Sequence, residues 1–410
     1  MISINYINMN NHNIVNRLKK TNQHKLLSHY EKLDSALKVE FENNIKDADL
    51  EVIVDSFNNN YVKNDEISRI EKLEVYTKDD ITQKYYDKGV ATLSEGRVAL
   101  FILSGGMGSR LGFNSPKGMF EILDNLSIFE VIFKRLLKLV ETIKFSPFIF
   151  IMTSVSNHNE IVEFFHKNNF FGYDLKKVKF FPQGEVPVID ENGDFLLKSN
   201  SDLVLVPDGN GGIFRAINNS FVKNELIDNN IEWINIIGID NVLVKPLDPN
   251  FIGLTLSKGQ MLSSKSVMRK YDSEKVGLML KKNGKPIILE YTEVPKEMRE
   301  ERLSNGEFKF ADSNIISHIF NVKKLLNITK MGLPFHKAFK KVSYFDGEKL
   351  IKPEIENAYK FEQFLFDVFE KFDDMLIYRV EREREFSPLK NKVGKDSIET
   401  ARNDLIREGI

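Results

Sequence analysis

The chain of 410 residues is longer than one hydrophobic core usually organises, so we expect two or three units around one large domain. Its 58 basic and 59 acidic residues nearly cancel, which leaves no global field to attract nucleic acid or a membrane surface. The absence of cysteine excludes disulfides, thiolate metal sites and cysteine nucleophiles. The chain also lacks a signal-like or membrane-spanning apolar run, so the expected location is cytoplasmic.

The first part of the chain predicts helices. Residues 1 to about 20 are rich in asparagine and are expected to be disordered. From Gln23 onward, apolar residues recur at helical spacing in two groups: Leu26, Leu27, Tyr30, Leu33 and Leu37, then Leu50, Ile53, Val54 and Phe57. We predict an N-terminal helical region over residues 1–94 that packs on the main domain, with a direct substrate role as the weaker alternative.

From Val98 onward, short apolar runs alternate with longer helical patterns, which indicates a mostly parallel sheet covered on both faces. The expected strands are Val98–Leu103, Pro147–Thr153, Val178–Phe181, Leu203–Val206 and Ile234–Ile239. A helix should begin after Ser127, whose spacing to Glu130 is that of a capping box. We predict a main domain over residues 95–391 and a short C-terminal segment over 392–410, with ligands at the carboxyl ends of the strands.

A glycine-rich segment, Leu103 to Lys117, follows the first strand, and its glycines allow backbone N–H groups to approach an anion. It is not the dinucleotide fingerprint, because the position three after Gly108 is Leu111, and it lacks the Gly-Lys-Ser/Thr order of a Walker loop. Arg110 and Lys117 add a guanidinium fork and an ammonium group. The segment therefore predicts a phosphate-binding loop; the alternative is a glycine-rich turn with two solvated cations.

Two further loops follow expected strands. Gln183-Gly184 offers a donor and an acceptor that suit the imide edge of uracil, although such a pair alone is usually a turn. The segment Pro207 to Gly212 adds three glycines at the next strand end. Together the two loops predict a pocket for a nucleotide base.

Asp240 ends the fifth expected strand, where a carboxylate is a poor core residue and a good Mg²⁺ ligand. The alternative is an Asx cap or turn. Because Asp240 should share a sheet edge with the glycine-rich loop, we favour the metal ligand.

Three weaker signals predict sugar contacts. Gly277 interrupts a strand pattern, Glu290 could accept hydroxyl groups, and Asn314 is expected at the start of a helix, where it could equally be a simple cap. Further along, the aromatic stripe from Phe361 to Phe372 predicts a core helix, with Lys360 just before it. The charged run Glu381–Glu385 predicts a solvated surface.

Lys390 follows a Ser-Pro turn. It is either a second phosphate clamp or a surface cation, and taken alone it is more often the latter.

In their order along the chain, these motifs resemble those of eukaryotic-type UDP-N-acetylhexosamine pyrophosphorylases. The resemblance covers about residues 23–402 and rests on Gly-Gly-x-Gly-Ser-Arg-Leu-Gly-x-x-x-Pro-Lys-Gly-Met, Gln-Gly, Pro-Asp-Gly-Asn-Gly-Gly, Asp-Asn-x-Leu-Val-Lys, Glu-Tyr and Phe-Ser-Pro-Leu-Lys-Asn. Ser109 stands where that family usually has threonine, which keeps the hydroxyl group. The resemblance implies an α/β fold with the Rossmann-like, mixed and mostly parallel sheet of the GT-A-like nucleotide-diphospho-sugar transferases.

The resemblance also implies roles for individual residues. Uridine would be held by Gly105, Gly106, Gln183 and Gly209, the triphosphate by Arg110 and Lys117, the metal by Asp240, the N-acetyl sugar by Asn210, Gly277, Glu290 and Asn314, and the sugar-phosphate end by Lys360 and Lys390. Arg110, Lys117 and Lys390 are the predicted catalytic residues. The expected cofactor is Mg²⁺, with Mn²⁺ as the alternative.

The implied reaction is in-line attack of N-acetylglucosamine 1-phosphate on the α-phosphorus of UTP, which releases pyrophosphate. The expected partners are these two small molecules, with no nucleic acid and no membrane, for a monomer or weak homodimer. Family members usually continue beyond the position of Ile410 into a small domain, so we expect either a natural absence of that domain or a fragment. Whether the preferred sugar is GlcNAc or GalNAc stays open.

Two alternatives to this function remain. A UDP-glucose or broad UDP-sugar pyrophosphorylase is disfavoured by the Arg-Leu-Gly and Pro-Lys-Gly-Met forms of the loop. A non-catalytic UDP-sugar-binding regulator is disfavoured because Arg110, Lys117, Asp240 and Lys390 are all present.

Overall fold

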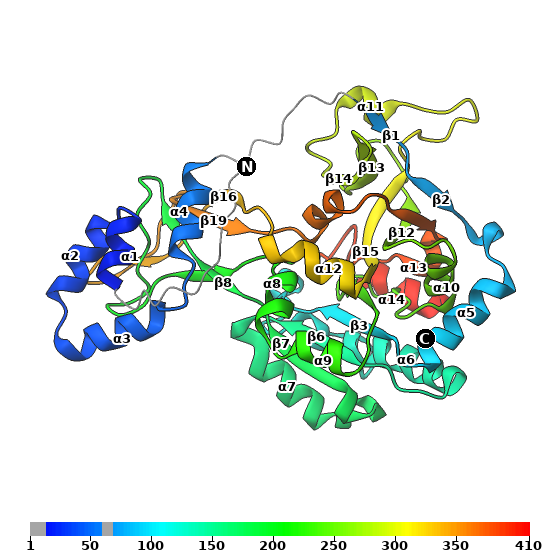
Figure 1. Cartoon of the computed structure of the whole chain (residues 1–410), viewed down its shortest axis with the longest axis horizontal. Coiled ribbons are helices and arrows are strands. Elements are labelled where there is room, and N and C mark those ends of the chain that lie inside the picture. The colour runs from blue at the N-terminus through cyan, green and yellow to red at the C-terminus, as the bar shows by residue number, and fades with distance from the viewer. Residues whose placement is uncertain (1–13, 60–68) are drawn as a thin grey trace. The chain divides into compact units, whose positions relative to one another are not determined.

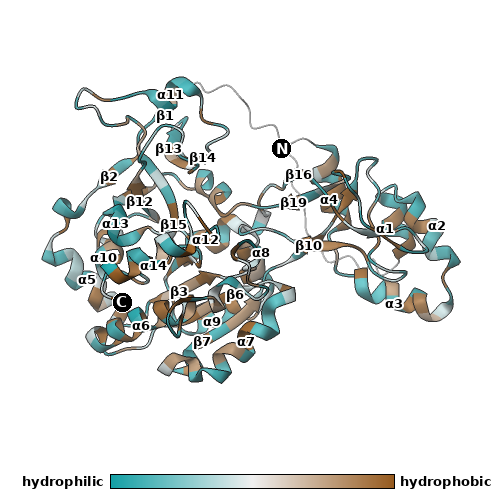
Figure 2. Ribbon diagram, turned by 180° about the vertical axis from the view of Figure 1, so that it is seen from behind, coloured by the Kyte–Doolittle hydropathy of each residue, from teal (hydrophilic) through white to brown (hydrophobic). Residues whose placement is uncertain are grey.

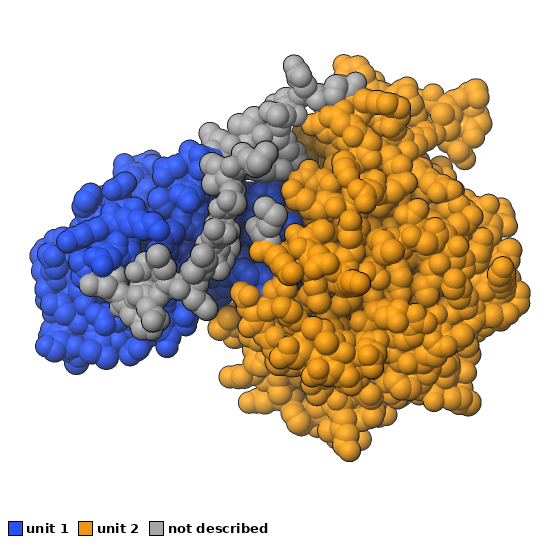
Figure 3. Space-filling model, viewed as in Figure 1, with its two compact units in different colours: residues 1–65, 183–215, 331–365 blue, residues 66–182, 216–330, 366–410 orange. Residues whose placement is uncertain are grey.

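The computed structural model describes residues 14–59 and 69–410, which belong to two compact units (Figures 1 and 3). Unit 1 comprises residues 1–65, 183–215 and 331–365, and unit 2 comprises residues 66–182, 216–330 and 366–410. Each unit is built from three separate segments, whereas the predicted domains 1–94, 95–391 and 392–410 are continuous in sequence. Within the described part of the chain, no helix is both long and apolar enough to cross a membrane.

The strands of unit 2 are β1 (Ile70–Glu71), β2 (Glu74–Tyr76), β3 (Val98–Leu103), β4 (Glu121–Leu123), β5 (Leu126–Ser127), β6 (Ile149–Thr153), β7 (Val178–Pro182), β11 (Trp233–Gly238), β12 (Leu262–Met268), β13 (Leu278–Lys282), β14 (Lys285–Leu289), β15 (Asp312–Asn321) and β20 (Leu376–Arg379). Its helices are α5 (Gln83–Ser94), α6 (Ile128–Ile143), α7 (His158–Lys167), α9 (Val222–Asp228), α10 (Pro249–Ser257), α11 (Lys296–Glu300), α12 (Val322–Ile328), α13 (Arg382–Glu385) and α14 (Ile398–Arg407).

Unit 1 contains the helices α1 (Ile14–Lys20), α2 (His24–Lys32), α3 (Ser35–Ile45) and α4 (Leu50–Asn58). Its strands are β8 (Glu185–Pro187), β9 (Ile189–Asp190), β10 (Leu205–Pro207), β16 (His336–Lys340), β17 (Tyr344–Phe345), β18 (Leu350–Ile351) and β19 (Ala358–Glu362). Helix α8 (Gly212–Asn219) spans the boundary between the two units in sequence.

The main sheet of unit 2 has the strand order β2-β20-β12-β15-β11-β3-β6-β7. Only β15 on this path runs antiparallel to its neighbours, β11 and β12; all other neighbouring strands are parallel. The prediction of a mixed, mostly parallel sheet is therefore confirmed. Because β3, β6, β7 and β11 are parallel, the loops that follow them leave the same edge of the sheet.

Both faces of this sheet are buried, as its continuous apolar runs predict. All six residues of β3 are buried; Leu100 and Ile102 belong to the core that includes the stripe of α6, and Phe101 stacks on Phe150 with ring centroids 4.7 Å apart. Figure 2 shows the strands β3 and β6 mainly in hydrophobic colours. Helix α6 begins as predicted, since Ser127 Oγ accepts a hydrogen bond of 3.1 Å from the Glu130 N–H.

Two glycines allow helices α5 and α10 to cross with their backbones in contact. A Cβ on Gly89 would lie 1.9 Å from Pro249 O, and one on Gly253 would lie 1.7 Å from Tyr85 O. Neither position accepts a side chain. The start of α10, next to Asp248, is therefore held firmly against α5.

The helices of unit 1 confirm the predicted N-terminal helical pattern. Leu26, Tyr30, Leu50 and Ile53 are buried, as the helical spacing predicts. Asp34 is the N-cap of α3, and its Oδ1 accepts a hydrogen bond of 2.9 Å from the Leu37 N–H. The sequence predicts disorder for residues 1 to about 20, of which residues 1–13 lie outside the described residues. For residues 14–20 the prediction is wrong, because they form α1 and bury Ile14 and Leu18 in the core of unit 1.

Two predicted elements are wrong in their pairing or their type. The expected strand Leu203–Val206 does not join the main sheet, because β10 pairs only with β8 in a small sheet of unit 1. The aromatic stripe from Phe361 is not one helix; it begins in β19 and continues in a 3₁₀ helix, Leu365–Lys371. Phe361, Phe369 and Phe372 are nevertheless buried and Phe364 is partly buried, so the apolar spacing predicted burial correctly but not the helix.

Asn314 does not begin a helix but lies in β15. There the register against β12 shifts between Ser264 and Ser266, and Ile316 adopts a φ of +52°. The run Glu381–Glu385 is not a solvated surface throughout, since it contains α13 and the side chain of Glu385 is buried. Ion pairing within the fold, which local sequence does not encode, explains the burial of Glu385.

Candidate active site

The predicted phosphate loop follows β3 and closes on itself through backbone hydrogen bonds. The Lys117 N–H donates to Gly106 O over 3.1 Å, and the Gly108 N–H donates to Ser115 O over 2.9 Å. Asn157, which sequence reasoning missed, is buried and donates from Nδ2 to Gly105 O over 3.2 Å. A Cβ on Gly106 would meet no atom within 4 Å, so the loop is open on this side.

Arg110 lies in a 3₁₀ turn, Ser109–Leu111, whose last residue is buried and anchors it. Gly112 then reverses the chain with a φ of +75°, a conformation that favours glycine. The Arg110 side chain is exposed and, within residues 14–59 and 69–410, has no recorded hydrogen bond or ion pair. Its guanidinium group is therefore available to a ligand.

Lys117 and Asp240 form an ion pair. The Lys117 Nζ lies 2.7 Å from Asp240 Oδ1 and 3.4 Å from Leu389 O. The Lys117 side chain is 13% exposed and that of Asp240 is 48% exposed. The structure thus brings together Lys117, the lysine predicted to bind the triphosphate, and Asp240, the predicted metal ligand, which lies two residues after the end of β11.

Asp240 fits the predicted Mg²⁺ only in combination with a bound phosphate. Among the residues that the structure describes, no group of three or more His, Cys, Asp and Glu side chains could hold a metal. Mg²⁺ commonly takes one or two carboxylates and completes its shell with phosphate oxygens and water. A half-exposed carboxylate beside a phosphate loop suits that arrangement.

The segment that carries Lys390 is bound to the loop of Asp240. The Leu389 N–H donates to Asp240 O over 2.8 Å. Asn241 is buried; its Oδ1 accepts from the Ser387 N–H over 2.9 Å, and its Nδ2 donates to Glu385 O over 2.7 Å. Lys390 itself is exposed, next to this junction. Sequence reasoning missed Asn241, although its place directly after Asp240 is a signal for such a role.

The three predicted sugar residues of unit 2 also meet. The Asn314 N–H donates to Gly277 O over 2.9 Å, directly before β13. A Cβ on Gly277 would lie 3.1 Å from Glu290 Oε1 and 2.7 Å from Ile288 Cγ2. Asn314 Oδ1 accepts from the Ile316 N–H over 2.9 Å and supports the strained residue there.

The remaining predicted residues belong to unit 1. Gln183 is buried and directly follows β7. Gly209 has a φ of +86°, and a Cβ there would lie 2.5 Å from Gln363 O. Asn210 Oδ1 accepts a hydrogen bond of 2.9 Å from the Leu365 N–H, while Lys360 lies partly buried in β19.

Asp208 is a buried carboxylate of unit 1 that sequence reasoning did not single out. Neither carboxylate oxygen has a hydrogen-bond partner, and Arg215 Nε is 3.9 Å from Oδ2. A Cβ on Gly184 or Gly212 would lie 2.5 or 2.0 Å from these oxygens, so only glycine fits at either position. Burial raises the pKa of Asp208 to about 7, against the opposing charge of Arg215.

Replacing Asp208 by asparagine is expected to raise stability at pH 8 and to change it little at pH 4. Because the folded pKa lies above the ordinary value, the unfolded chain loses the proton first, so wild-type stability falls as pH rises from about 4 to 7. The total loss of wild-type stability across this pH range is at most about 4 kcal/mol, at about 1.4 kcal/mol per pKa unit.

Thermal unfolding from pH 4 to 8 measures this difference. The exposed Asp346, whose pKa is lowered by backbone hydrogen bonds, provides a control in the same unit, since its asparagine variant should gain nothing as pH rises. Parallel wild-type and Asp208→Asn curves would show that this carboxylate does not titrate in the range.

Comparisons with known proteins agree with these observations. The chain matches the model of the UTP–glucose-1-phosphate uridylyltransferase family over residues 45–396. It is 34% identical to the UDP-N-acetylglucosamine pyrophosphorylase of Saccharomyces cerevisiae over 342 residues, which is 80% of this chain and 72% of the yeast protein. It is 32% identical to UDP-N-acetylglucosamine diphosphorylase 2 of Arabidopsis thaliana over 360 residues, which is 82% of this chain and 70% of the plant protein.

Among solved structures, the uridine diphosphate N-acetylglucosamine pyrophosphorylase of Trypanosoma brucei, crystallised with an inhibitor, is similar with a TM-score of 0.81 and 25% sequence identity. That similarity covers 98% of this chain and 85% of the trypanosomal one. The chain therefore belongs to the UTP–glucose-1-phosphate uridylyltransferase family and, within it, to the UDP-N-acetylglucosamine pyrophosphorylases.

Proposed function

We propose that this chain transfers the uridylyl group of UTP to N-acetylglucosamine 1-phosphate and releases pyrophosphate. The observation that carries the proposal is the ion pair of Lys117 and Asp240 beside an open glycine loop. This pair combines a cation for phosphate with a carboxylate for a phosphate-bound metal, in a chain whose relatives carry the name of this activity.

In the proposed reaction, a phosphate oxygen of the sugar phosphate attacks the α-phosphorus of UTP and forms the new P–O bond. The bond to the β-phosphate breaks, and its electron pair leaves with pyrophosphate. The nucleophile is already an anion, so no general base is required. Arg110, Lys117 and Lys390 would bind and orient phosphate groups that repel one another and neutralise the charge that develops on the leaving group.

Asp240 would hold Mg²⁺ or Mn²⁺ together with oxygens of the nucleotide. When bound, the ion would supply further neutralisation of phosphate charge. Lys117 would share the carboxylate with the ion, since its Nζ contacts Oδ1.

The sugar side favours an N-acetylated substrate over glucose 1-phosphate. Asn314 Oδ1 is engaged by the Ile316 N–H, so the polar group that Asn314 can offer a ligand is its Nδ2 donor. An acetamido carbonyl could accept that hydrogen bond, whereas glucose 1-phosphate has no acetamido group. Glu290, near Gly277, would accept bonds from sugar hydroxyls.

UDP-glucose synthesis is the second candidate, because the matching family model describes a glucose-1-phosphate enzyme. Pyrophosphate release from UTP should be measured with the 1-phosphates of GlcNAc, GalNAc and glucose. We expect an N-acetylated sugar to exceed glucose by roughly 10²-fold or more in kcat/KM, since polar sites discriminate strongly against a missing partner. Equal or better turnover of glucose 1-phosphate would favour the second candidate.

Replacing Gly277 by alanine is expected to raise KM for the sugar phosphate roughly 10-fold and to leave KM for UTP nearly unchanged, because each 1.4 kcal/mol of lost binding is tenfold. The added Cβ would clash with Ile288 and displace Glu290. Steady-state kinetics with each substrate varied in turn measures the effect.

Gly284→Ala is the matched control, because it strains the turn of the same hairpin at a φ of +79° but meets no atom within 4 Å. An equal rise of KM in both variants would attribute the effect to general weakening of the hairpin.

The expected assembly, location and partners are also proposals. The near balance of 58 basic and 59 acidic residues supports a protein without nucleic-acid or membrane partners. We propose that the protein is cytoplasmic and that it is a monomer or weak homodimer. Sedimentation at several concentrations would test the assembly.

A further inference from the structure

Lys265 is a lysine buried inside the main sheet of unit 2. Its side chain, in the middle of β12, is 1% exposed. The Nζ lies 2.7 Å from Asp248 Oδ2 and 2.5 Å from Glu385 Oε2, and both carboxylates are themselves about nine-tenths buried. Burial disfavours the charged amine, but these two carboxylates outweigh it and raise the pKa of Lys265. The ammonium group is therefore charged and bridges two anions.

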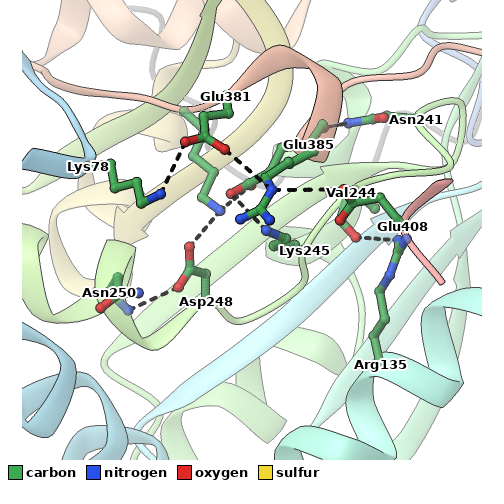
Figure 4. Close-up of polar contacts among 12 residues, drawn as sticks. Lys78, Arg135, Asn241, Val244, Lys245, Asp248, Asn250, Glu381, Glu385 and Glu408 are labelled. Atoms are coloured by element: carbon green, nitrogen blue, oxygen red, sulfur yellow. Dashed lines mark hydrogen bonds and ion pairs between the residues drawn. The ribbon is translucent and has the colours of Figure 1, made fainter. Parts of the chain in front are cut away.

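The two carboxylates stand at the ends of two loops, one of which carries the predicted metal ligand Asp240 and the other the predicted catalytic residue Lys390. Asp248 ends the loop that begins at Asp240, and its Oδ1 caps α10 by accepting from the Asn250 N–H over 3.0 Å. Glu385 ends α13 and begins the segment that leads to Lys390. Figure 4 shows Asp248, Glu385 and Lys245 around this cluster.

The same two loops are joined at their other ends by backbone hydrogen bonds, from Leu389 to Asp240 and from Val242 to Ser387. Arg135 of α6 supports the first loop by donating from Nη1 to Val242 O and Val244 O, each over 2.8 Å. Lys245 of the first loop also pairs with Glu385 over 3.6 Å, but among the described residues only Lys265 is ion-paired to both Asp248 and Glu385.

We propose that Lys265 is a positioning residue of the uridylyl transfer, which clamps the loops 240–248 and 385–390 and so sets Asp240 and Lys390 relative to Lys117. This inference rests on the proposed function for its effect on rate, but the clamp itself does not. A rigid clamp is useful here because a displacement of about 1 Å in a catalytic group can cost about 10²-fold in rate. The buried charges also explain why the run Glu381–Glu385 is not a solvated surface.

The test must separate the clamp from simple loss of folding. Lys265→Met alone would leave the buried Asp248 without an ion pair and Glu385 with only Lys245, whose Nζ lies 3.6 Å from Oε1, and could unfold the protein. We therefore combine it with Asp248→Asn and Glu385→Gln, which keep the shape and the cap of α10 and remove every buried charge of the cluster. The matched control is the double variant Lys179→Met with Glu225→Gln. Lys179 is also a lysine in a strand of the same sheet, and its Nζ lies 3.4 Å from Glu225 Oε1.

Hydrogen exchange of peptides that cover residues 239–248 and 385–391 is the first readout. We expect the neutral triple variant to exchange these peptides at least about 10-fold faster than wild type, with Tm and the rest of unit 2 little changed. The control variant should leave these peptides as in wild type. Unchanged exchange in the triple variant overturns the clamp, whatever the protein catalyses.

Kinetics give the second readout. We expect kcat to fall about 10–100-fold, a range typical of residues that orient a functional group, with smaller changes in KM. In a Lys390→Ala background the same triple change should lower kcat by a smaller factor, because Lys390, one of the two groups that the clamp positions, is already absent. Full and equal activity of wild type and triple variant overturns the positioning role, whereas an inactive wild type would count against the proposed function and leave the exchange result to decide the clamp.

Discussion

Replacing Lys117 by methionine is expected to lower kcat/KM about 10²–10³-fold, the loss typical of removing one preorganised charge-stabilising group. The effect on folding should be much smaller. Asp240, the partner that loses its ion pair, is 48% exposed and can be solvated, and ion pairs with such exposure contribute about 0–1 kcal/mol. The rate loss corresponds to about 2.7–4 kcal/mol of transition-state stabilisation, so catalysis rather than stability should dominate.

Asp240→Asn should cause a rate loss of similar size. In the double variant the two losses should not multiply, because residues that act as one unit give strongly non-additive effects. Steady-state kinetics of the two single variants and the double variant, with Tm for each, measure this. Losses that multiply, or near wild-type turnover in either single variant, would contradict a joint role of the pair.

The second large effect is expected at Arg110, where alanine should reduce kcat about 10²–10³-fold with an unchanged Tm. No contact within the described residues is lost, since the side chain is exposed and has no recorded partner. Arg110→Lys should recover only part of the activity, because an ammonium group lacks the two-pronged geometry of guanidinium.

Arg384 offers a control, as an exposed arginine whose side chain is 57% exposed and whose ion pairs are with Glu381 and Glu408. Arg384→Ala should keep wild-type kinetics. Loss of activity in both arginine variants would point to a general effect of surface charge, and full activity of Arg110→Ala would remove Arg110 from the reaction.

The parts of the site that the sequence predicted are those encoded in short segments. The glycine loop after β3 and the carboxylate after β11 depend on local chain direction and on the parallel order of the strands, and the sheet places Lys117 2.7 Å from Asp240. The α6 helix was predictable for the same reason, because its cap and its buried stripe lie within one stretch of chain.

The parts that could not be predicted depend on pairings across long distances in the chain. Glu385 looks like a surface residue within its charged run, yet it is buried and ion-paired with Lys265, 120 residues away, and with Lys245. Asn314 lies in a strand whose register shifts against β12, a feature that the sequence around it does not announce. For Lys265 a weak signal existed: a lysine within the run Leu262–Met268, at a position where a buried strand rarely carries a charge.

The most direct test of the central claim is the stoichiometry of the reaction on the 410-residue chain. UTP labelled at the α-phosphate is incubated with Mg²⁺ and N-acetylglucosamine 1-phosphate. The UDP-sugar is quantified by its label, and the pyrophosphate, which carries no label, is quantified separately. The account predicts one UDP-N-acetylglucosamine for each pyrophosphate, only when both substrates are present, and a loss of both products in Lys117→Met. UDP-N-acetylglucosamine that binds without any product being formed would contradict it and would indicate a sugar-nucleotide-binding protein without the transfer activity.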